Sequence, residues 1–467
     1  MHPRGAWHTG PAMRSTLLSL GLLACSEPPA PPEAPRAPPR MMVGKAPKQG
    51  PEDLASSWSE ALAAVVPPAA NGAVCSDADG DGFVDAWACP ATPIDQADCN
   101  DHDAKITPAN ERFVRPGPFL MGSASPESGW DERPVHIVYL SGYCLEVNEH
   151  ATADGRPLEG ISWDIAKSTC EGLGLRLPTE AEWEKGARGG CELGSDPSRC
   201  DKDDLRAYPW GNNEAPSCAN STHQSLGPQG PTLCESGAHA VTEAKNTSPY
   251  GLRDMAGNVW EYVADRYHMQ VYAHAAVRTD PLGPPTGDTH VLRGGGWNTY
   301  ATNMRVANRF LSVVEGSAVG MRCARGPLVG ATDDVPPVEM VAVRGEIVSS
   351  GLKLEGVAIN IAAFNVADLD PATQMPNPGR SPIVEEAFKA EGHERQAFEF
   401  HVPRGLSYQI TAGLDAGAAP DAPGKGFRVR SGSGGFGRAD RTIQADGDVE
   451  GVIITIVTAA PPPGPRR

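Results

Sequence analysis

Runs of aspartate near the start of the chain have the spacing of a cation-binding loop. Residues 75–89 read CSDADGDGFVDAWAC, with carboxylates at alternate positions and two glycines that allow a sharp turn. Carboxylates gathered in a tight loop are preferred ligands of calcium, and a backbone carbonyl such as that of Phe83 can add one more oxygen. The candidate ligands of this first cluster are Asp77, Asp79, Asp81 and Asp85.

The loop is not a complete EF-hand, because Ala88 stands where that motif has a glutamate. The shorter pattern resembles the calcium repeats of thrombospondin type 3 and dockerin. A second cluster in DCNDHDAKITPANE resembles a metal-binding repeat of myxobacterial surface proteins; its candidate ligands are Asp98, Asn100, Asp101 and Asp103. The alternative is a pair of acidic turns held by disulfides. We expect structural calcium, since a module this small cannot bury a sufficient hydrophobic core.

The overall charge excludes nucleic acid as a partner. The chain carries 40 basic and 58 acidic residues, a net charge of −18. Binding to phosphates demands clustered lysine and arginine, which this composition does not offer. At 467 residues the chain is also too long for one ordinary core, so several domains are expected.

The N-terminal residues indicate export and a lipid anchor. Arg14 precedes an apolar run from Leu17 to Ala24, far shorter than the roughly 20 residues that cross a bilayer. The run ends at Cys25 and resembles a bacterial lipoprotein signal, with Cys25 as the lipid-modified residue; the alternative is a plain secretory signal. We expect attachment to the cell envelope, at the outer membrane or the cell surface. The expected segments are the signal at 1–25 and a Pro-rich tether at 26–70.

The remaining cysteines predict disulfides. Setting Cys25 aside leaves ten of eleven, and an even number in an oxidising compartment favours bridges over reactive thiols. The spacing leaves the connectivity open. Candidate local pairs are Cys191 with Cys200 and Cys218 with Cys234, while Cys144 could take the residue left over among Cys75, Cys89 and Cys99.

Two helices with clear start signals are predicted within residues 161–190. Ser162 can cap the first, which carries Cys170 and ends at Gly174. Thr179 begins a capping box for the second, which ends at a Gly-Gly pair. We interpret the glutamates of the second helix as cap and solvent-facing residues; they are Glu180, Glu182 and Glu184.

The central region carries the phrases RLPTEAEWE, YPWGN, DMAGNVWE and RGGGW in that order. Together they resemble the formylglycine-generating enzyme, or sulfatase-modifying factor, family. For residues 111–330 the resemblance implies an irregular α+β domain related to C-type lectins. It also implies a disulfide between Cys170 and Cys323, and calcium held near the GNVWE segment by Asn258 and Glu261.

The reactive cysteine pair of the family is absent from this chain. In active members two cysteines follow the tryptophan of the last phrase, bind copper(I) and activate oxygen to convert a substrate cysteine to formylglycine. Here those positions hold Thr299 and Met304. Soft thiolates suit copper(I), and a hydroxyl with a thioether is a poor substitute. We therefore expect no copper and no catalytic residue at these positions.

Residues 338–460 alternate apolar and polar side chains in runs broken by Gly, Pro and Asp, which is typical of an antiparallel sandwich. The phrase FEFHVPRGLSYQITAGLD resembles the carboxypeptidase-regulatory-like, transthyretin-type β-sandwich. The predicted chain is thus multidomain. Its folded parts are an Asp/Cys-rich module at 71–110, the irregular α+β domain at 111–330 and an all-β sandwich at 338–460.

Two classes of function remain open. The first is a non-catalytic surface protein whose enzyme-derived domain binds a peptide, a glycan or an envelope protein. The second is an active oxidoreductase of the family that uses copper or iron through other ligands. The missing cysteine pair favours the first, while the intact surrounding motifs support the second. A purely structural spacer in the envelope would explain the tether and the sandwich, but not the central domain.

Overall fold

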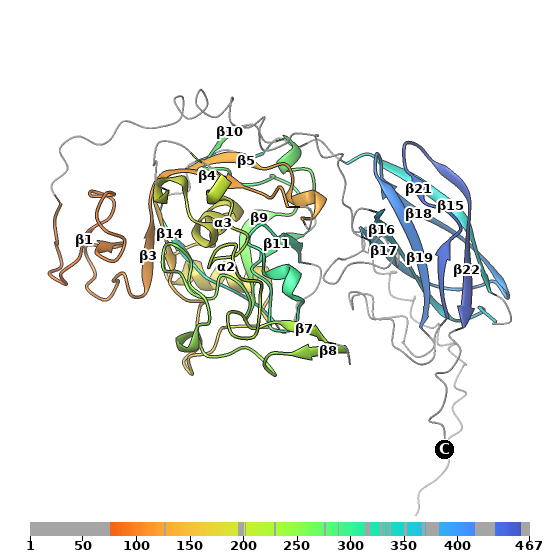
Figure 1. Cartoon of the computed structure of the whole chain (residues 1–467), viewed down its shortest axis with the longest axis horizontal. Helices are drawn as coiled ribbons and strands as arrows, with labels where there is room; N and C mark the ends of the chain where they lie inside the picture. The colour runs from red at the N-terminus through yellow and green to blue at the C-terminus, as the bar shows by residue number, and fades with distance from the viewer. Residues whose placement is uncertain are drawn as a thin grey trace, which may run out of the picture. The chain divides into compact units, whose positions relative to one another are not determined.

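The computed structural model describes residues 75–458, apart from the gaps named at the end of this paragraph (Figure 1). The predicted signal and tether at 1–25 and 26–70, with Cys25, lie outside the described residues. Within the described part, none of the helices has both the length and the apolar character that a membrane crossing needs. The gaps are 126–127, 195–199, 201, 228–229, 275–276, 288, 313–317, 327–329, 331, 334, 336–337, 350–352, 367–368, 370–382 and 416–434.

The acidic module has very little regular structure. Its two short strands, β1 (Val84–Asp85) and β2 (Ala97–Asp98), pair in parallel. A disulfide closes its first loop between Cys75 and Cys89, and another joins Cys99 to Cys144 of the central domain. The ring of Trp87 meets the ring of Phe113 edge-on, with centroids 5.4 Å apart. The disulfides therefore provide stabilisation that a larger domain obtains from its hydrophobic core.

The central domain is built from short strands in small sheets, as the resemblance implied. One sheet has the order β14-β6-β3, a second β10-β5-β4 and a third β12-β11-β9-β13, and β7 pairs with β8. The strands are β3 (Glu111–Val114), β4 (Gly117–Met121), β5 (His136–Leu140), β6 (Tyr143–Glu146), β7 (Gln224–Gly227), β8 (Gly230–Leu233), β9 (Trp260–Arg266), β10 (Val277–Thr279), β11 (His290–Arg293), β12 (Phe310–Leu311), β13 (Val319–Met321) and β14 (Ala324–Arg325). Because β14 pairs with β6, the last strand of this domain lies beside one of its first.

Short helical turns complete the domain. Two α-helices, α2 (Trp163–Gly172) and α3 (Glu180–Arg188), begin and end where the capping signals predicted. The Ser162 side chain accepts from the Ile165 N–H, and the Thr179–Glu182 capping box is formed. The 3-10 turns are η1 (Trp130–Glu132), η2 (Cys191–Leu193), η3 (Lys202–Asp204), η4 (Val241–Glu243), η5 (Tyr272–His274) and η6 (Ala301–Met304).

The predicted solvent face of α3 is wrong, because every residue of this helix is buried. The helix contacts β4, β5, β9 and β11, so its carboxylates face protein on all sides. Arginines neutralise them: Glu180 pairs with Arg309 and Glu184 with Arg293, both far along the chain, and Glu182 pairs with the nearby Arg176. A buried carboxylate is tolerated when it is paired and hydrogen-bonded. The charged residues of the motif phrases thus form part of the core.

The C-terminal strands that period-two alternation predicted are present. They form one eight-stranded sheet in the order β17-β16-β19-β20-β22-β15-β18, with β21 paired to β19. Alternate residues such as Ile359, Ile361 and Ile410 are fully buried. One pairing departs from the antiparallel expectation, because β15 and β22 run parallel. The strands are β15 (Met340–Ser349), β16 (Ala358–Asn365), β17 (Val384–Lys389), β18 (Arg395–Pro403), β19 (Ser407–Asp415), β20 (Gly435–Ala439), β21 (Ile443–Gln444) and β22 (Val449–Thr458).

Candidate functional site

Thr299 lies in a tight turn that follows β11. Its backbone N–H donates to the Gly296 carbonyl at 2.9 Å. Its hydroxyl accepts from the Gly296 N–H at 2.9 Å and donates to the Gly296 carbonyl, also at 2.9 Å. Both hydrogen-bonding functions of the side chain are therefore used within the turn. The Thr299 side chain is thus bonded within its own turn, at the first of the two positions where the family resemblance implied a cysteine.

Met304 ends the 3-10 turn η6, and its side chain is fully buried. Its terminal methyl packs against Gly295, whose φ of +80° favours glycine. A Cβ atom at Gly295 would collide with this methyl group. Methionine commonly fills such irregular gaps in a core. Its thioether is therefore part of the packing and is not presented to solvent.

All ten cysteines of the described residues are joined in disulfides. Cys144 pairs with Cys99, which leaves Cys75 to pair with Cys89. The other pairs are Cys170 with Cys323, Cys191 with Cys200 and Cys218 with Cys234. The described part of the chain accordingly offers no free thiol. Cys25, the eleventh cysteine, lies outside it.

Asn258 and Glu261, the expected calcium ligands, have separate protein partners. Glu261 receives Nε and Nη2 of Arg322 at 2.7 and 2.8 Å, and the Trp183 indole N–H at 2.8 Å. The Asn258 amide oxygen accepts from the His239 N–H at 2.8 Å, and its NH₂ group donates to Glu149. Both side chains are fully buried. The oxygens of both side chains therefore accept hydrogen bonds from the protein.

Comparisons with known proteins find similarity over the region that carries the motif phrases. Residues 146–327 match the model of the sulfatase-modifying factor enzyme 1-like domain. The formylglycine-generating enzyme of Thermomonospora curvata is 32% identical over 254 residues, which cover 52% of this chain and 71% of that enzyme. This chain belongs to the sulfatase-modifying factor family.

Two further similarities extend the comparison. The inactive C-alpha-formylglycine-generating enzyme 2 of Bos taurus is 34% identical over 180 residues, or 36% of this chain and 50% of that protein. Among solved structures, Treponema denticola variable protein 1 is 21% identical with a TM-score of 0.36, and the match covers 46% of this chain and 95% of that one. The proteins similar to this domain thus include a formylglycine-generating enzyme and a protein that is named as inactive.

Thr299 and Met304, at the two positions where the family resemblance implied copper-binding cysteines, do not fit a copper ion. Copper(I) prefers soft sulfur ligands. The described residues hold no free thiol, and the one sulfur at this position, in Met304, is buried in packing. The hydroxyl of Thr299 is a hard group already bonded within its turn. No copper-dependent step follows from this arrangement.

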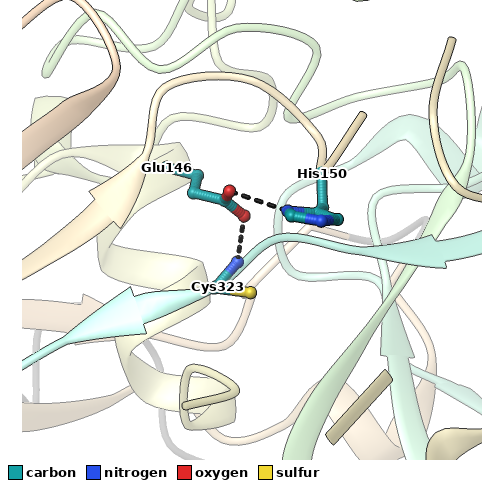
Figure 2. A group of neighbouring side chains, drawn as sticks. All are labelled: Glu146, His150 and Cys323. Carbon is teal, nitrogen blue, oxygen red and sulfur yellow. Dashed lines mark hydrogen bonds and ion pairs between the residues drawn. The ribbon is translucent and has the colours of Figure 1, made fainter. Parts of the chain in front are cut away.

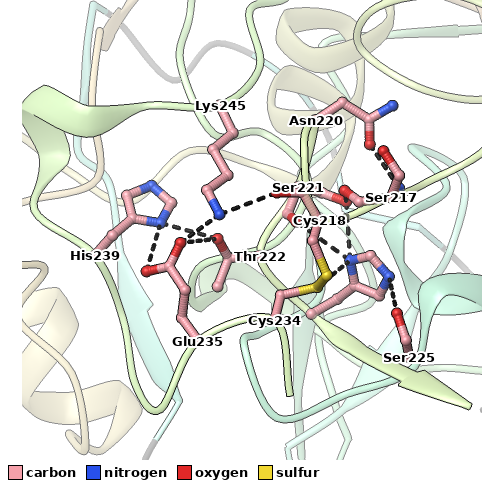
Figure 3. Close-up of a disulfide and its surroundings, with 11 residues drawn as sticks. Ser217, Cys218, Asn220, Ser221, Thr222, Ser225, Cys234, Glu235, His239 and Lys245 are labelled. Carbon is pink, nitrogen blue, oxygen red and sulfur yellow. Dashed lines mark hydrogen bonds and ion pairs between the residues drawn. A yellow bond between two sulfur atoms is a disulfide. The ribbon is translucent and has the colours of Figure 1, made fainter. Parts of the chain in front are cut away.

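A loop at residues 217–239, which contains the Cys218–Cys234 disulfide, contacts the turn of Thr299. Figure 3 shows this disulfide and its surroundings. The Gln224 N–H donates to the Thr299 carbonyl at 2.6 Å, and the Asn258 N–H donates to the Thr222 carbonyl at 3.0 Å. This loop therefore contacts both the turn that lost its cysteine and the GNVWE segment. The Cys218–Cys234 bridge joins two segments of the loop that lie 16 positions apart in the sequence.

Thr222 and His239 of this loop form a hydrogen-bonded group with Asp254, which lies outside the loop. The Thr222 hydroxyl lies 3.0 Å from His239 Nδ1, and His239 Nε2 lies 2.8 Å from an Asp254 oxygen. The arrangement resembles a catalytic triad, but Thr222 is completely buried and its hydroxyl cannot meet a substrate. We interpret this group of hydrogen-bonded side chains as structural. This hydrogen-bonded group was not predicted, because Asp254 lies in the DMAGNVWE phrase but Thr222 and His239 lie in no motif that would pair them with it.

A second polar group joins Glu146, His150 and Cys323 (Figure 2). Glu146 bonds to His150 Nδ1 at 2.8 Å and accepts from the Cys323 N–H at 2.7 Å. The hydrogen bond that His150 makes to the Glu146 carboxylate raises the pKa of His150. Because the Cys323 sulfur is bonded to Cys170, it offers no thiolate to a metal. The group is therefore an ion pair beside a disulfide.

The Glu146–His150 pair should make stability depend on pH. Since the folded-state pKa of His150 lies above its ordinary value of 6.5, the stabilisation is fully present below that value and is lost as pH rises through the folded pKa. His150→Gln should lower the free energy of unfolding by about 1 kcal/mol near pH 5, and by clearly less near pH 8. Urea unfolding at both pH values measures this. An equal loss at both would contradict the assignment.

The structure interleaves the two acidic clusters predicted from the sequence. Carboxylate oxygens of Asp79, Asp81 and Asp98 lie within 4.8 Å of one another, and those of Asp77, Asp79 and Asp101 form a second such group. Asp98 is fully buried. Burial, together with the neighbouring carboxylates, raises the pKa of Asp98 to about 6. Residues of the second cluster thus complete the first loop.

Two other candidate ligands, Asp85 and Asp103, lie outside these carboxylate groups, and the third is the amide residue Asn100. An Asp85 oxygen accepts from the Trp87 N–H at 2.8 Å, and an Asp103 oxygen accepts from the Lys105 N–H at 3.2 Å. The Asn100 carbonyl accepts from the N–H groups of His102 and Asp103. All three close local turns. Residue type and spacing could not separate these residues from the clustered ones.

Proposed function

We propose that this protein is an exported, lipid-anchored envelope protein whose sulfatase-modifying-factor domain binds a partner and does not oxidise cysteine. The observation that carries the proposal is the use made of the two positions where active relatives have cysteine. Thr299 closes its own turn, and Met304 fills the core. The existence of a similar protein named inactive supports a non-catalytic role.

The partner is a peptide, a glycan or another envelope protein. The net charge of −18 speaks against nucleic acid. The proposal of a lipid anchor rests on the sequence around Cys25. Metabolic labelling with a fatty acid tests this proposal directly. If Cys25 takes up no label, the lipid anchor is rejected and a secreted protein without an anchor is the remaining interpretation.

The test of the central domain is a search for product. We expect that the purified protein, supplied with copper(I), oxygen and a panel of cysteine peptides, yields no aldehyde above the enzyme-free control by mass spectrometry. The matched positive control is the formylglycine-generating enzyme of Thermomonospora curvata under identical conditions. Aldehyde formed by this protein would reject the binding proposal and favour the alternative, an active oxidoreductase with other metal ligands.

A further inference from the structure

Three aspartates of the acidic module share an unusual pattern. In each, Oδ1 accepts from a backbone N–H two residues further along the chain: Asp79 from Asp81 at 3.2 Å, Asp81 from Phe83 at 2.9 Å and Asp98 from Asn100 at 3.1 Å. In each, Oδ2 is shielded from solvent and has no hydrogen-bond donor. The three carboxylates lie together, within 4.8 Å of one another.

This arrangement is unfavourable for the protein by itself. A buried carboxylate oxygen without a donor loses its hydration and gains nothing in return. Three negative charges at this separation also repel one another. The chain nevertheless holds them together, through the parallel pairing of β1 with β2 and the Cys75–Cys89 bridge. A positive ion bound by the three carboxylates would remove both penalties.

The neighbouring aspartates play a different part. Asp77 accepts from the N–H groups of Gly80 at 2.7 Å and Gly82 at 3.0 Å, using both oxygens. Asp101 likewise uses both, accepting from the Ala78 N–H at 2.9 Å and the Ser76 hydroxyl at 3.2 Å. These two residues shape the loop. The unsatisfied oxygens belong to the other three.

We propose that Asp79, Asp81 and Asp98 together hold one calcium ion, in a site that spans both acidic clusters. Carboxylate oxygens are hard ligands that suit calcium or magnesium and not the softer transition metals. Calcium tolerates the irregular geometry of a loop, whereas magnesium demands a near-ideal octahedron and keeps its waters. The site does not depend on whether the central domain is catalytic.

The ion would also fasten the module to the central domain. Asp98 is followed by Cys99, whose disulfide reaches Cys144 in β6. The Trp87 indole donates to the Cys99 carbonyl at 3.1 Å, and its ring contacts Phe113 of β3. Fixing Asp98 therefore fixes the segment that carries both the bridge and the aromatic contact. Near-ultraviolet circular dichroism, which reports on the packing of aromatic rings, should change when calcium binds.

The experiment compares Asp98→Asn with Asp103→Asn in the full chain. After removal of divalent ions with a chelator, calcium is titrated in by calorimetry. Asparagine at 98 keeps an oxygen for the Asn100 N–H but loses the charge, so calcium affinity should fall by roughly 100-fold. Asp103 serves as the matched control, because it lies outside both carboxylate groups and only closes a turn. Its variant should bind as the parent protein does.

Several results would overturn the site. A parent protein that binds no calcium would do so, and so would an Asp98→Asn variant of unchanged affinity or an equal loss in Asp103→Asn. If Asp98→Asn fails to fold, Asp81→Asn replaces it, because its side chain is less deeply buried and carries the same free oxygen. The same loss of affinity is expected there, with the near-ultraviolet spectrum of the ion-free parent retained.

Discussion

Replacing Glu261 with glutamine should lower the free energy of unfolding by about 3–5 kcal/mol. Glu261 and Arg322 form a fully buried pair, with two guanidinium nitrogens at 2.7 and 2.8 Å from the carboxylate. Burial would lower the pKa of Arg322, but the Glu261 carboxylate holds it above its ordinary value. Glutamine leaves this guanidinium charged, buried and without its counter-ion. Three backbone carbonyls that also accept from it cannot supply the missing charge.

Urea unfolding of the full chain measures this loss, and Glu171→Gln provides the matched control. Glu171 pairs with Lys167 at 2.6 Å, but both side chains are about half exposed. Because solvent screens such pairs, the control should change stability by less than about 0.5 kcal/mol. If Glu261→Gln proved as mild as Glu171→Gln, the buried pair would not hold this core together.

Removing the Cys170–Cys323 disulfide, with alanine at both positions, should cost about 4–5 kcal/mol of stability. The bridge joins residues 153 positions apart, so it strongly restricts the unfolded chain. It links α2 to the segment between β13 and β14, and both sulfurs lie in the buried core. Both cysteines are replaced so that no free thiol remains to form a wrong pair.

The matched control removes the bridge between Cys191 and Cys200, which are only 9 positions apart. A short loop restricts the unfolded chain less, so the expected loss is about 2–3 kcal/mol. Chemical denaturation of both variants under oxidising conditions gives the comparison. Equal losses would mean that native-state packing around the bridges, and not loop length, sets their contribution.

Local signals in the sequence determined several elements of this protein correctly. Ser162 and the Thr179–Glu182 box fixed where α2 and α3 begin, because a cap depends on residues within one turn. Period-two alternation fixed strands such as β16, since side chains of a strand alternate between faces. The motif phrases identified the family, and the identities of Thr299 and Met304 already argued against a copper site.

Only the tertiary structure decided which charged groups meet. The sequence alone suggested that Glu180 and Glu184 face solvent, but the fold buries them against Arg309 and Arg293. Likewise, spacing divided the acidic module into two clusters, and the parallel pairing of β1 with β2 brought Asp98 into the first. A local pattern reports a residue's own turn or strand. Electrostatic partners far along the chain become neighbours only once the fold sets their distance.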